Sequence, residues 1–225
     1  MDAEIQTTYP KALPLEQEIV NQSRTGYLIA KRVMDIGGAA FGLVLFLPIF
    51  LIVAVLNKLE DPRGPVFYKQ TRVGKNGKEF RMYKFRSMVC DADQQLESLM
   101  HLNEVDGAMF KIKDDPRITK VGKFIRKTSI DELPQFWNVL RGDMSLVGPR
   151  PPLPGEVEEY TKFEKQRLLV TPGCTGLWQV SARNSVGFSE MVELDLKYIR
   201  EQSIGKDVLI IFRTAYVMIK SKDAF

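Results

Sequence analysis

The chain has 225 residues, 44% of them hydrophobic and 27% charged, which is the balance of a folded globular protein rather than a disordered one. A net charge of +4 at neutral pH favours anionic partners, namely nucleic acid, phosphorylated ligands or anionic lipid. A single histidine and two distant cysteines, Cys90 and Cys174, argue against a multi-histidine or zinc site, a disulfide scaffold and a Ser-His-Asp triad.

Residues 1–30 are interpreted as a polar N-terminal extension. Their first 24 residues hold two prolines and show little hydrophobic periodicity. They lack the basic start and the early apolar run of a signal peptide. We expect either a mobile extension or a short docking helix over residues 15–22.

A long apolar segment follows the extension. Residues 36–56 contain no ionisable side chain, and 21 residues of helix would be roughly 30 Å long, the thickness of a bilayer's hydrocarbon core. Pro48 predicts a break in this helix, and basic residues flank both ends, with Lys31 and Arg32 before it and Lys58 after it. A single crossing would leave one basic cluster on the outer face, against the positive-inside rule. We therefore predict a re-entrant membrane segment over residues 31–58, with a buried core helix as the alternative.

Two strands are predicted next, over residues 66–70 and 80–86, and Asn76-Gly77 between them is a strong hairpin signal. The stretch 58–86 carries nine basic and three acidic side chains, which suits either anionic lipid headgroups or phosphate groups. Helical apolar periodicity follows in several stretches: 91–103, 118–125, 136–142, 156–169, 189–202 and 205–222. The predicted fold class is α+β, mostly helical, with a small β-hairpin, a re-entrant helix-break-helix and interfacial amphipathic helices.

Asp131 and Glu132 stand side by side within residues 128–135. Ser129 with Glu132 matches the capping-box pattern, whereas Pro134 suits the first helical turn if Asp131 is itself the N-cap. Either register places both carboxylates at a helix N-terminus, which favours ionised carboxylates and nearby phosphates. The alternative is a capped helix start with no chemical role.

The surrounding charges bear on that choice. Cations attract phosphates, but two carboxylates repel them unless one binds a divalent metal or attacks phosphorus. The sequence has no Walker loop and no GxGxxG motif, and nucleic-acid binding would not explain the membrane segment. The residues by themselves therefore predict a membrane-associated enzyme that acts on a phosphorylated substrate.

Seven motifs carry a family resemblance: KRxxD from Lys31, GPVxYxQxRxG from Gly64, YKFRSM from Tyr83, DPRIT from Asp115, RKTSIDELPQ from Arg126, GDMSLVGPRP from Gly142 and PGxTGLWQV from Pro172. Together they resemble the bacterial sugar transferase family, the monotopic polyprenyl-phosphate phosphoglycosyl transferases. The resemblance runs from about Lys31 to the C-terminus and is most specific over residues 126–150. Larger relatives carry additional transmembrane helices first, so this chain is expected to be the minimal catalytic form.

The resemblance implies an enzyme of the bacterial inner membrane whose catalytic domain, residues 59–225, lies on the cytoplasmic face. It implies transfer of a sugar 1-phosphate from a UDP-sugar to undecaprenyl phosphate, with release of UMP, as the first step of exopolysaccharide, capsule or glycan assembly. In the implied ping-pong mechanism Asp131 forms a phosphosugar intermediate and Glu132 binds Mg²⁺. Arg126 and Arg150 are implied to contact phosphate.

Further motif positions are implied to belong to the substrate site: Lys84, Arg86, Gln179, Arg183 and Asn184. Many family members have Ser-Pro at the membrane break, where this chain has Leu47-Pro48. Galactose or glucose is favoured as the sugar, whereas the glycan pathway and the oligomeric state, a homo-oligomer included, stay open. Two alternatives also stay open: a non-catalytic membrane-anchored module that binds anionic lipid, and direct metal-assisted transfer without a covalent intermediate.

Overall fold

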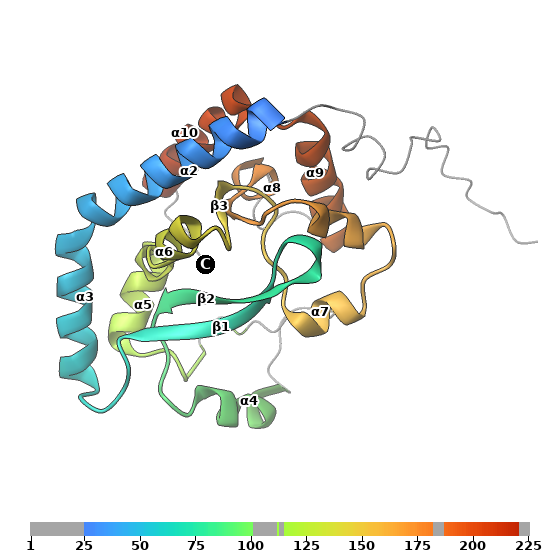
Figure 1. Cartoon of the computed structure of the whole chain (residues 1–225). Coiled ribbons are helices and arrows are strands. Elements are labelled where there is room, and N and C mark those ends of the chain that lie inside the picture. Colours follow the sequence, from blue (N-terminus) through green and yellow to red (C-terminus); the bar gives the residue numbers. More distant parts are fainter. Residues whose placement is uncertain (1–24, 101–111, 113–114, 182–186, 221–225) are drawn as a thin grey trace, which may run out of the picture.

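The computed structural model describes residues 25–100, 112, 115–181 and 187–220. Within these ranges the chain is mostly helical and has two small sheets of two strands each, as Figure 1 shows. The predicted α+β class is therefore confirmed. The extension over residues 1–24, with its expected helix at 15–22, lies outside the described residues.

Helix α2 (Thr25–Leu45) and helix α3 (Leu47–Glu60) are the two arms of the apolar segment. They meet at a bend of 57°, and Pro48 occupies the first turn of α3, so the predicted break is confirmed. None of the described helices is by itself long and apolar enough to cross a bilayer. The bent pair taken together meets that requirement of length and composition.

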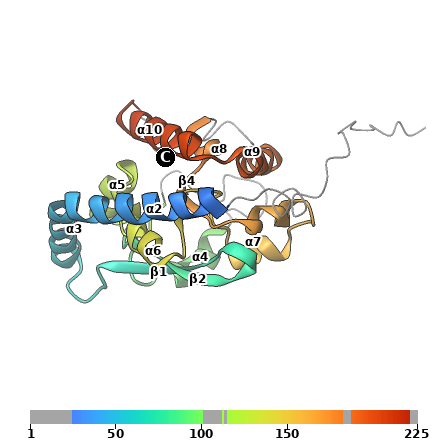
Figure 2. The same cartoon turned by 45° about the horizontal axis from the view of Figure 1, so that its top comes forward.

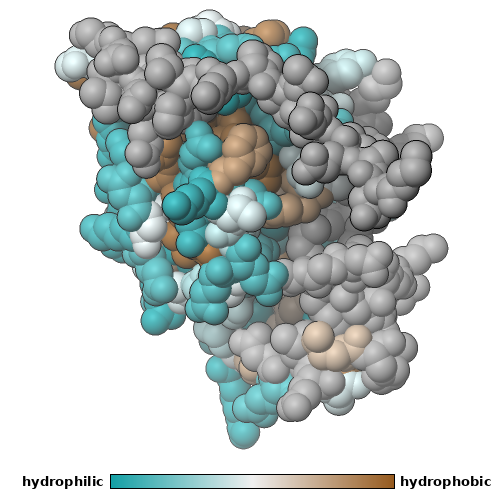
Figure 3. Space-filling model, turned by 90° about the vertical axis from the view of Figure 1, so that its right-hand side faces the viewer, coloured by the Kyte–Doolittle hydropathy of each residue, from teal (hydrophilic) through white to brown (hydrophobic). Residues whose placement is uncertain are grey.

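The two arms expose much of their apolar surface. Val44 and Leu59 are each 75% exposed, and many of their neighbours on α2 and α3 are more than half exposed. The side of the molecule opposite α3 is different, because most of its described surface is hydrophilic and surrounds one larger apolar patch (Figure 3). Large apolar exposure of this kind marks a face that contacts something other than water.

The basic residues Lys31 and Arg32, which flank the apolar segment as the sequence predicts, make contacts inside the protein. The Lys31 ammonium is buried and lies 2.8 Å from Asp207. Arg32 donates to the carbonyl oxygens of Val139 and Leu140, both at 2.7 Å. These contacts fix α2 to the rest of the fold, and the charge of Lys31 is paired inside it.

The predicted hairpin is confirmed. Strand β1 (Phe67–Val73) pairs antiparallel with strand β2 (Glu79–Phe85), so the first strand runs three residues further than the sequence pattern indicated. The turn contains η1 (Lys75–Gly77), in which Asn76 and Gly77 adopt φ angles of 57° and 77°. Asn and Gly tolerate this left-handed region best, which explains why the turn forms at these two residues.

The second sheet is a short parallel pair, β3 (Ser145–Val147) and β4 (Gly173–Thr175). Helices surround the two sheets, as Figures 1 and 2 show: α4 (Ala92–Leu99), α5 (Lys120–Lys127), α6 (Gln135–Arg141), α7 (Pro154–Glu158), η4 (Glu164–Leu169), α8 (Leu177–Ser181), α9 (Phe188–Glu201) and α10 (Ile204–Lys220). The single helix expected over residues 156–169 is thus two short ones, and part of the helix expected over residues 91–103 lies outside the described residues.

The arms of the apolar segment pack into the core rather than standing apart from it. Ala39 of α2 is fully buried with Met82 of β2 and Val139 of α6. Val53 of α3 is buried with Phe85 of β2 and Ile125 of α5. The hairpin is therefore held against both arms, and α5 and α6 are held beside it.

Candidate active site

Asp131 and Glu132 lie in a single 3-10 turn, η3 (Ile130–Glu132), between α5 and α6. Both predicted helix registers are wrong, because α6 begins only at Gln135, after Pro134. Ser129 has a φ angle of 54° and makes no side-chain capping bond, so the capping box does not form. The pair is thus held by a tight turn between two helices and not by a helix N-terminus.

The Asp131 carboxyl is only 6% exposed, and within the described part of the chain its Oδ1 atom has no hydrogen-bond partner. Burial raises its pKa to about 6, and the charge of Glu132 adds to this effect, while Lys84 and Arg126 oppose it. The prediction that a helix N-terminus stabilises the ionised Asp131 carboxylate is therefore wrong. Burial works against that form, and a carboxyl whose pKa lies near neutrality can take and release a proton at working pH.

Glu132 has the opposite electrostatic character. The Lys84 ammonium lies 2.7 Å from its Oε1 atom, and a third of the Glu132 side chain is exposed. Burial tends to raise the pKa of Glu132, but the charges of Lys84 and Arg150 outweigh it and hold the pKa below its ordinary value. Two adjacent carboxyl groups with pKa values moved in opposite directions are suited to two different chemical roles.

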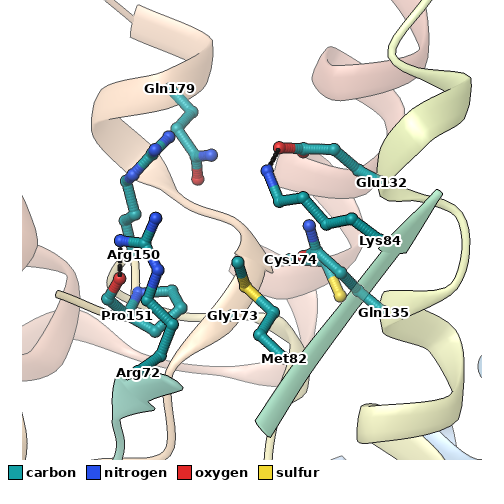
Figure 4. A pocket seen from close by; sticks show the side chains of 10 residues that line it. All are labelled: Arg72, Met82, Lys84, Glu132, Gln135, Arg150, Pro151, Gly173, Cys174 and Gln179. Atoms are coloured by element: carbon teal, nitrogen blue, oxygen red, sulfur yellow. Dashed lines mark hydrogen bonds and ion pairs between the residues drawn. The ribbon is translucent and has the colours of Figure 1, made fainter. Parts of the chain in front are cut away.

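A pocket with about 260 Å³ of empty space, its open mouth included, lies beside Glu132. Figure 4 shows Glu132, Lys84 and Gln135 on one wall, with Arg72, Arg150 and Gln179 facing them. The pocket residues come from β1, β2, η3, α6, β4, α8 and the loop after β3: Arg72, Met82, Lys84, Glu132, Gln135, Arg150, Pro151, Gly173, Cys174 and Gln179. Three cations around one ionised carboxylate make the pocket suitable for an anionic ligand.

Asn138 of α6 fixes the hairpin that carries Lys84. Its fully buried side chain accepts from the Tyr83 backbone N–H at 2.9 Å and donates to the Arg81 carbonyl oxygen at 2.7 Å. Since α6 follows the η3 turn directly, this amide sets the position of Lys84 relative to Glu132. Buried amides with all their partners present hold geometry well.

The profile of the bacterial sugar transferase family matches residues 26–221. The chain belongs to the bacterial sugar transferase family. It is 54% identical over 196 residues to the galactosyl transferase CpsE of Streptococcus agalactiae serotype III (strain NEM316), covering 86% of this chain and 43% of that protein. It is 42% identical over 209 residues to the undecaprenyl-phosphate galactose phosphotransferase of Salmonella typhimurium, covering 91% and 44%.

A third relative of this chain is more nearly matched in length. The exopolysaccharide production protein ExoY of Rhizobium meliloti (strain 1021) is 41% identical over 201 residues, 88% of each chain. Against the two relatives described first, the chain spans less than half of their length. The similarity to those proteins therefore concerns the part of them that corresponds to this chain.

The structure brings together some of the predicted site residues and separates others. Lys84, Glu132, Arg150 and Gln179 all line the pocket. Asp131 precedes Glu132 in the chain and is buried beside the pocket. Arg126 lies in the last turn of α5.

Arg86 is a different case. Its guanidinium ion-pairs with Asp61 at 2.5 Å and donates to the carbonyl oxygen of Asn57 at 3.1 Å. The described contacts of Arg86 thus connect β2 to the end of α3, and it does not line the pocket. Arg183 and Asn184 lie outside the described residues, so their assignment to the substrate site stays a prediction.

Sequence reasoning missed Arg72 and Gln135 as pocket residues. Arg72 was visible in the motif that begins at Gly64, and the alternation of β1 could have placed it on the same face as Gln70. That Gln135 faces the pocket follows only from the packing of α6. Both side chains are nearly fully buried, which is unusual for their residue types and points to a specific role.

The carboxylates also bear on the metal predicted from the family. Among the described residues no three potential ligands cluster around one point. Mg²⁺ commonly binds through one or two carboxylates and completes its shell with water and substrate phosphates. Glu132 is partly exposed at the pocket, and the neighbouring Asp131 has an unpartnered oxygen within the described chain. Glu132 therefore fits a Mg²⁺ ion that is shared with a phosphorylated substrate, and the free oxygen of Asp131 stays available to attack phosphorus.

Proposed function

We propose that this chain transfers a sugar 1-phosphate from a UDP-sugar to undecaprenyl phosphate and releases UMP. The observation that carries the proposal is the pocket itself: Arg72, Arg150 and Lys84 surround Glu132 there, and Asp131, whose pKa is shifted in the opposite direction, precedes Glu132 in the same turn. A non-catalytic lipid-binding module would need the cations but would have no use for a buried Asp131 whose Oδ1 atom has no hydrogen-bond partner in the described chain. The names of relatives that act on undecaprenyl phosphate and galactose agree with this chemistry.

The first half-reaction forms a covalent bond to the protein. An oxygen of ionised Asp131 attacks the phosphorus bonded to the sugar, the bond from that phosphorus to the oxygen of UMP breaks, and UMP leaves with the electron pair. In the second half-reaction an oxygen of undecaprenyl phosphate attacks the same phosphorus, and the Asp131 carboxylate leaves. Each half-reaction exchanges one phosphorus–oxygen bond for another, so no further reactant is required.

Glu132 and Lys84 assist from beside the nucleophile. Mg²⁺ bound by Glu132 would neutralise negative charge on the diphosphate. The Lys84 ammonium, 2.7 Å from Glu132, lowers the pKa of both carboxyl groups and so favours the ionised nucleophile. On donor binding it can also donate to a phosphate oxygen, because its side chain already faces the pocket.

The membrane part of the proposal rests on α2 and α3. A re-entrant arrangement at the cytoplasmic face of the inner membrane would place the exposed apolar faces of both arms in lipid and keep the pocket at the headgroup level. That depth suits a reaction between a water-soluble nucleotide sugar and a phosphate on a long lipid. In a protein whose exposed Cys90 is replaced by serine, cysteines introduced singly at residues 44 and 51, near the bend, should react with a lipid-soluble maleimide and resist a charged one added from either side.

The decisive test is to trap the intermediate. The protein is incubated with Mg²⁺ and a UDP-sugar labelled in the sugar, without undecaprenyl phosphate, and then examined by intact-protein mass spectrometry. The expected result is an adduct of one sugar phosphate on Asp131 with an equivalent of UMP. UMP formation that requires the lipid acceptor, without any adduct, would favour direct metal-assisted transfer.

Galactose is the sugar that we propose, because two of the relatives described above are named for it. Another relative, from Aeromonas hydrophila, is named for N-acetylgalactosamine and is 45% identical over 194 residues. UMP release should therefore be compared over UDP-galactose, UDP-glucose and UDP-N-acetylgalactosamine. The highest kcat/KM is expected with UDP-galactose.

A further inference from the structure

Arg72 is a buried cation without an acidic partner among the described residues. It is only 6% exposed, yet its guanidinium contacts neutral groups: the Gln70 side-chain oxygen at 2.7 and 3.2 Å and the Pro151 carbonyl oxygen at 3.0 Å. A buried charge normally needs an ion-pair partner, because neutral acceptors repay only part of its lost hydration. The charges of Glu156 and Glu132 act on Arg72, but neither carboxylate forms an ion pair with it among the described contacts, so the protein holds this charge in place and compensates it only in part.

A second cation makes the arrangement less favourable still. Arg150 lines the same wall of the pocket, as Figure 4 shows, and its charge, after burial itself, is the main cause that lowers the pKa of Arg72 to about 10. The charges of the two guanidinium groups therefore repel one another. Two fixed guanidinium groups on one wall are well matched to a phosphate group, which accepts from both.

The residues on the opposite wall indicate which phosphate group the two arginines would bind. Glu132 lies across the pocket from the two arginines, and Asp131 precedes it in the same turn. In a displacement at phosphorus the attacking and leaving oxygens lie roughly in line, so a nucleophile that attacks from the side of the η3 turn directs the leaving group towards the arginines. Negative charge develops on the departing UMP as the phosphorus–oxygen bond breaks, and cations on that side stabilise it.

We infer that Arg72, together with Arg150, binds the phosphate of the leaving UMP. This inference rests on the proposed function and assigns the role of one further residue in it. Gln70 acts as a positioning residue, because its side-chain oxygen accepts two hydrogen bonds from the Arg72 guanidinium and leaves the remaining donors for the ligand. The rigid carbonyl of Pro151 holds the third contact.

The test measures binding of UMP and of uridine to the full chain in detergent micelles by calorimetry. Arg72→Gln should weaken UMP binding about 10- to 100-fold, because a charge-assisted pair of hydrogen bonds is lost, and should leave uridine binding unchanged. The matched control is Arg81→Gln, which removes an exposed arginine from the neighbouring strand of the same hairpin. This control should bind UMP like the wild-type protein.

Gln70→Glu separates a binding role from a merely structural one. The new carboxylate would pair with Arg72, so the melting temperature should stay equal or rise, while UMP binding should weaken about 10-fold because the cation is already neutralised. A structural role for Arg72 predicts no loss of UMP binding in this variant.

Three outcomes would overturn the inference. Wild-type affinity for UMP in Arg72→Gln would exclude Arg72 from the phosphate site while leaving the proposed function intact. An equal loss of uridine and UMP binding in that variant would indicate general damage to the pocket rather than loss of a phosphate contact. If the wild-type protein bound neither compound, the proposed function would fail together with the inference.

Discussion

Two sets of buried charges in this molecule are built in opposite ways. Beneath α2, Lys31 pairs with Asp207, and the Tyr198 hydroxyl donates to the same carboxylate at 2.6 Å. Asp35, one turn further along α2, accepts from the Ser145 hydroxyl and from a backbone N–H, both at 2.9 Å. In this region each of these charges has a partner of opposite charge or a hydrogen-bond donor. We call these contacts of α2 with α9, α10 and β3 the framework network.

The pocket leaves its charges incomplete. Arg72 has neutral partners, Asp131 has an oxygen with no partner in the described chain, and Glu132 is partly exposed beside Lys84. An uncompensated buried charge lowers stability, so it persists where a ligand supplies the missing partner. The contrast with the framework network indicates that full pairing holds the fold together, whereas incomplete pairing prepares the pocket for an anion.

Asp131→Asn should give the largest effect. Without an ionisable nucleophile, UMP release should fall at least about 10³-fold, which a coupled UMP assay measures. The same change removes a buried carboxylate whose pKa is raised to about 6, so the free energy of unfolding at pH 7 should increase by about 2 kcal/mol. Unchanged UMP release would refute the assignment of the nucleophile, and UMP binding by the variant serves as the control for an intact pocket.

Lys31→Met tests the framework network. It leaves the fully buried Asp207 side chain without its cation, which should lower the free energy of unfolding by about 3–5 kcal/mol. Thermal and urea denaturation in micelles would measure the loss. The double variant with Asp207→Asn should recover most of that stability, because it no longer buries an unpaired charge.

Lys84→Met is the matched change in the pocket. The Lys84–Glu132 pair is partly exposed, so its loss should change stability by less than about 1 kcal/mol while transfer activity falls strongly. Equal destabilisation by the Lys31 and Lys84 variants would mean that the two regions do not differ in the way described above.

The pH profile should show an ascending limb near the Asp131 pKa. Below about pH 6 the nucleophile is protonated, so kcat/KM should fall about 10-fold per pH unit.

The free energy of unfolding has the opposite pH dependence, because the folded protein binds the Asp131 proton more tightly than the unfolded chain does. The stabilising contribution of this proton is present below about pH 4 and is lost as the pH rises through about 6. In Lys84→Met the limb should move to higher pH, since the Lys84 charge lowers the pKa of Asp131; a limb that stays in place would contradict that influence.

The smallest effect is expected from Thr119→Ala. The Thr119 side chain caps α5 by accepting from the Gly122 backbone N–H at 2.9 Å. Its loss should reduce the free energy of unfolding by about 1 kcal/mol and leave UMP release unchanged. A large loss of activity would show that the end of α5 near the η3 turn depends on its capped start.

Local features of the fold could be predicted from the sequence because they depend on neighbouring residues. Pro48 fixes the break between α2 and α3 since it lacks a backbone N–H, and Asn76-Gly77 fixes the hairpin turn since both tolerate positive φ. The predicted helix start at Asp131 and Glu132 was wrong, and the cause is also local. Ser129 adopts a left-handed conformation, and a 3-10 turn then satisfies the backbone locally in place of the capping box.

The sequence by itself therefore determined the family, the acidic pair at Asp131 and Glu132, and the apolar helix pair. Only the tertiary structure decided which cations meet that pair, because the pocket residues come from seven separate parts of the chain. It also decided that Arg86 joins β2 to α3 rather than lining the pocket, and that Lys31 lies inside the fold. Burial and pairing are properties of the packed chain, and they set the pKa of Asp131 and leave Arg72 without an acidic partner among the described residues.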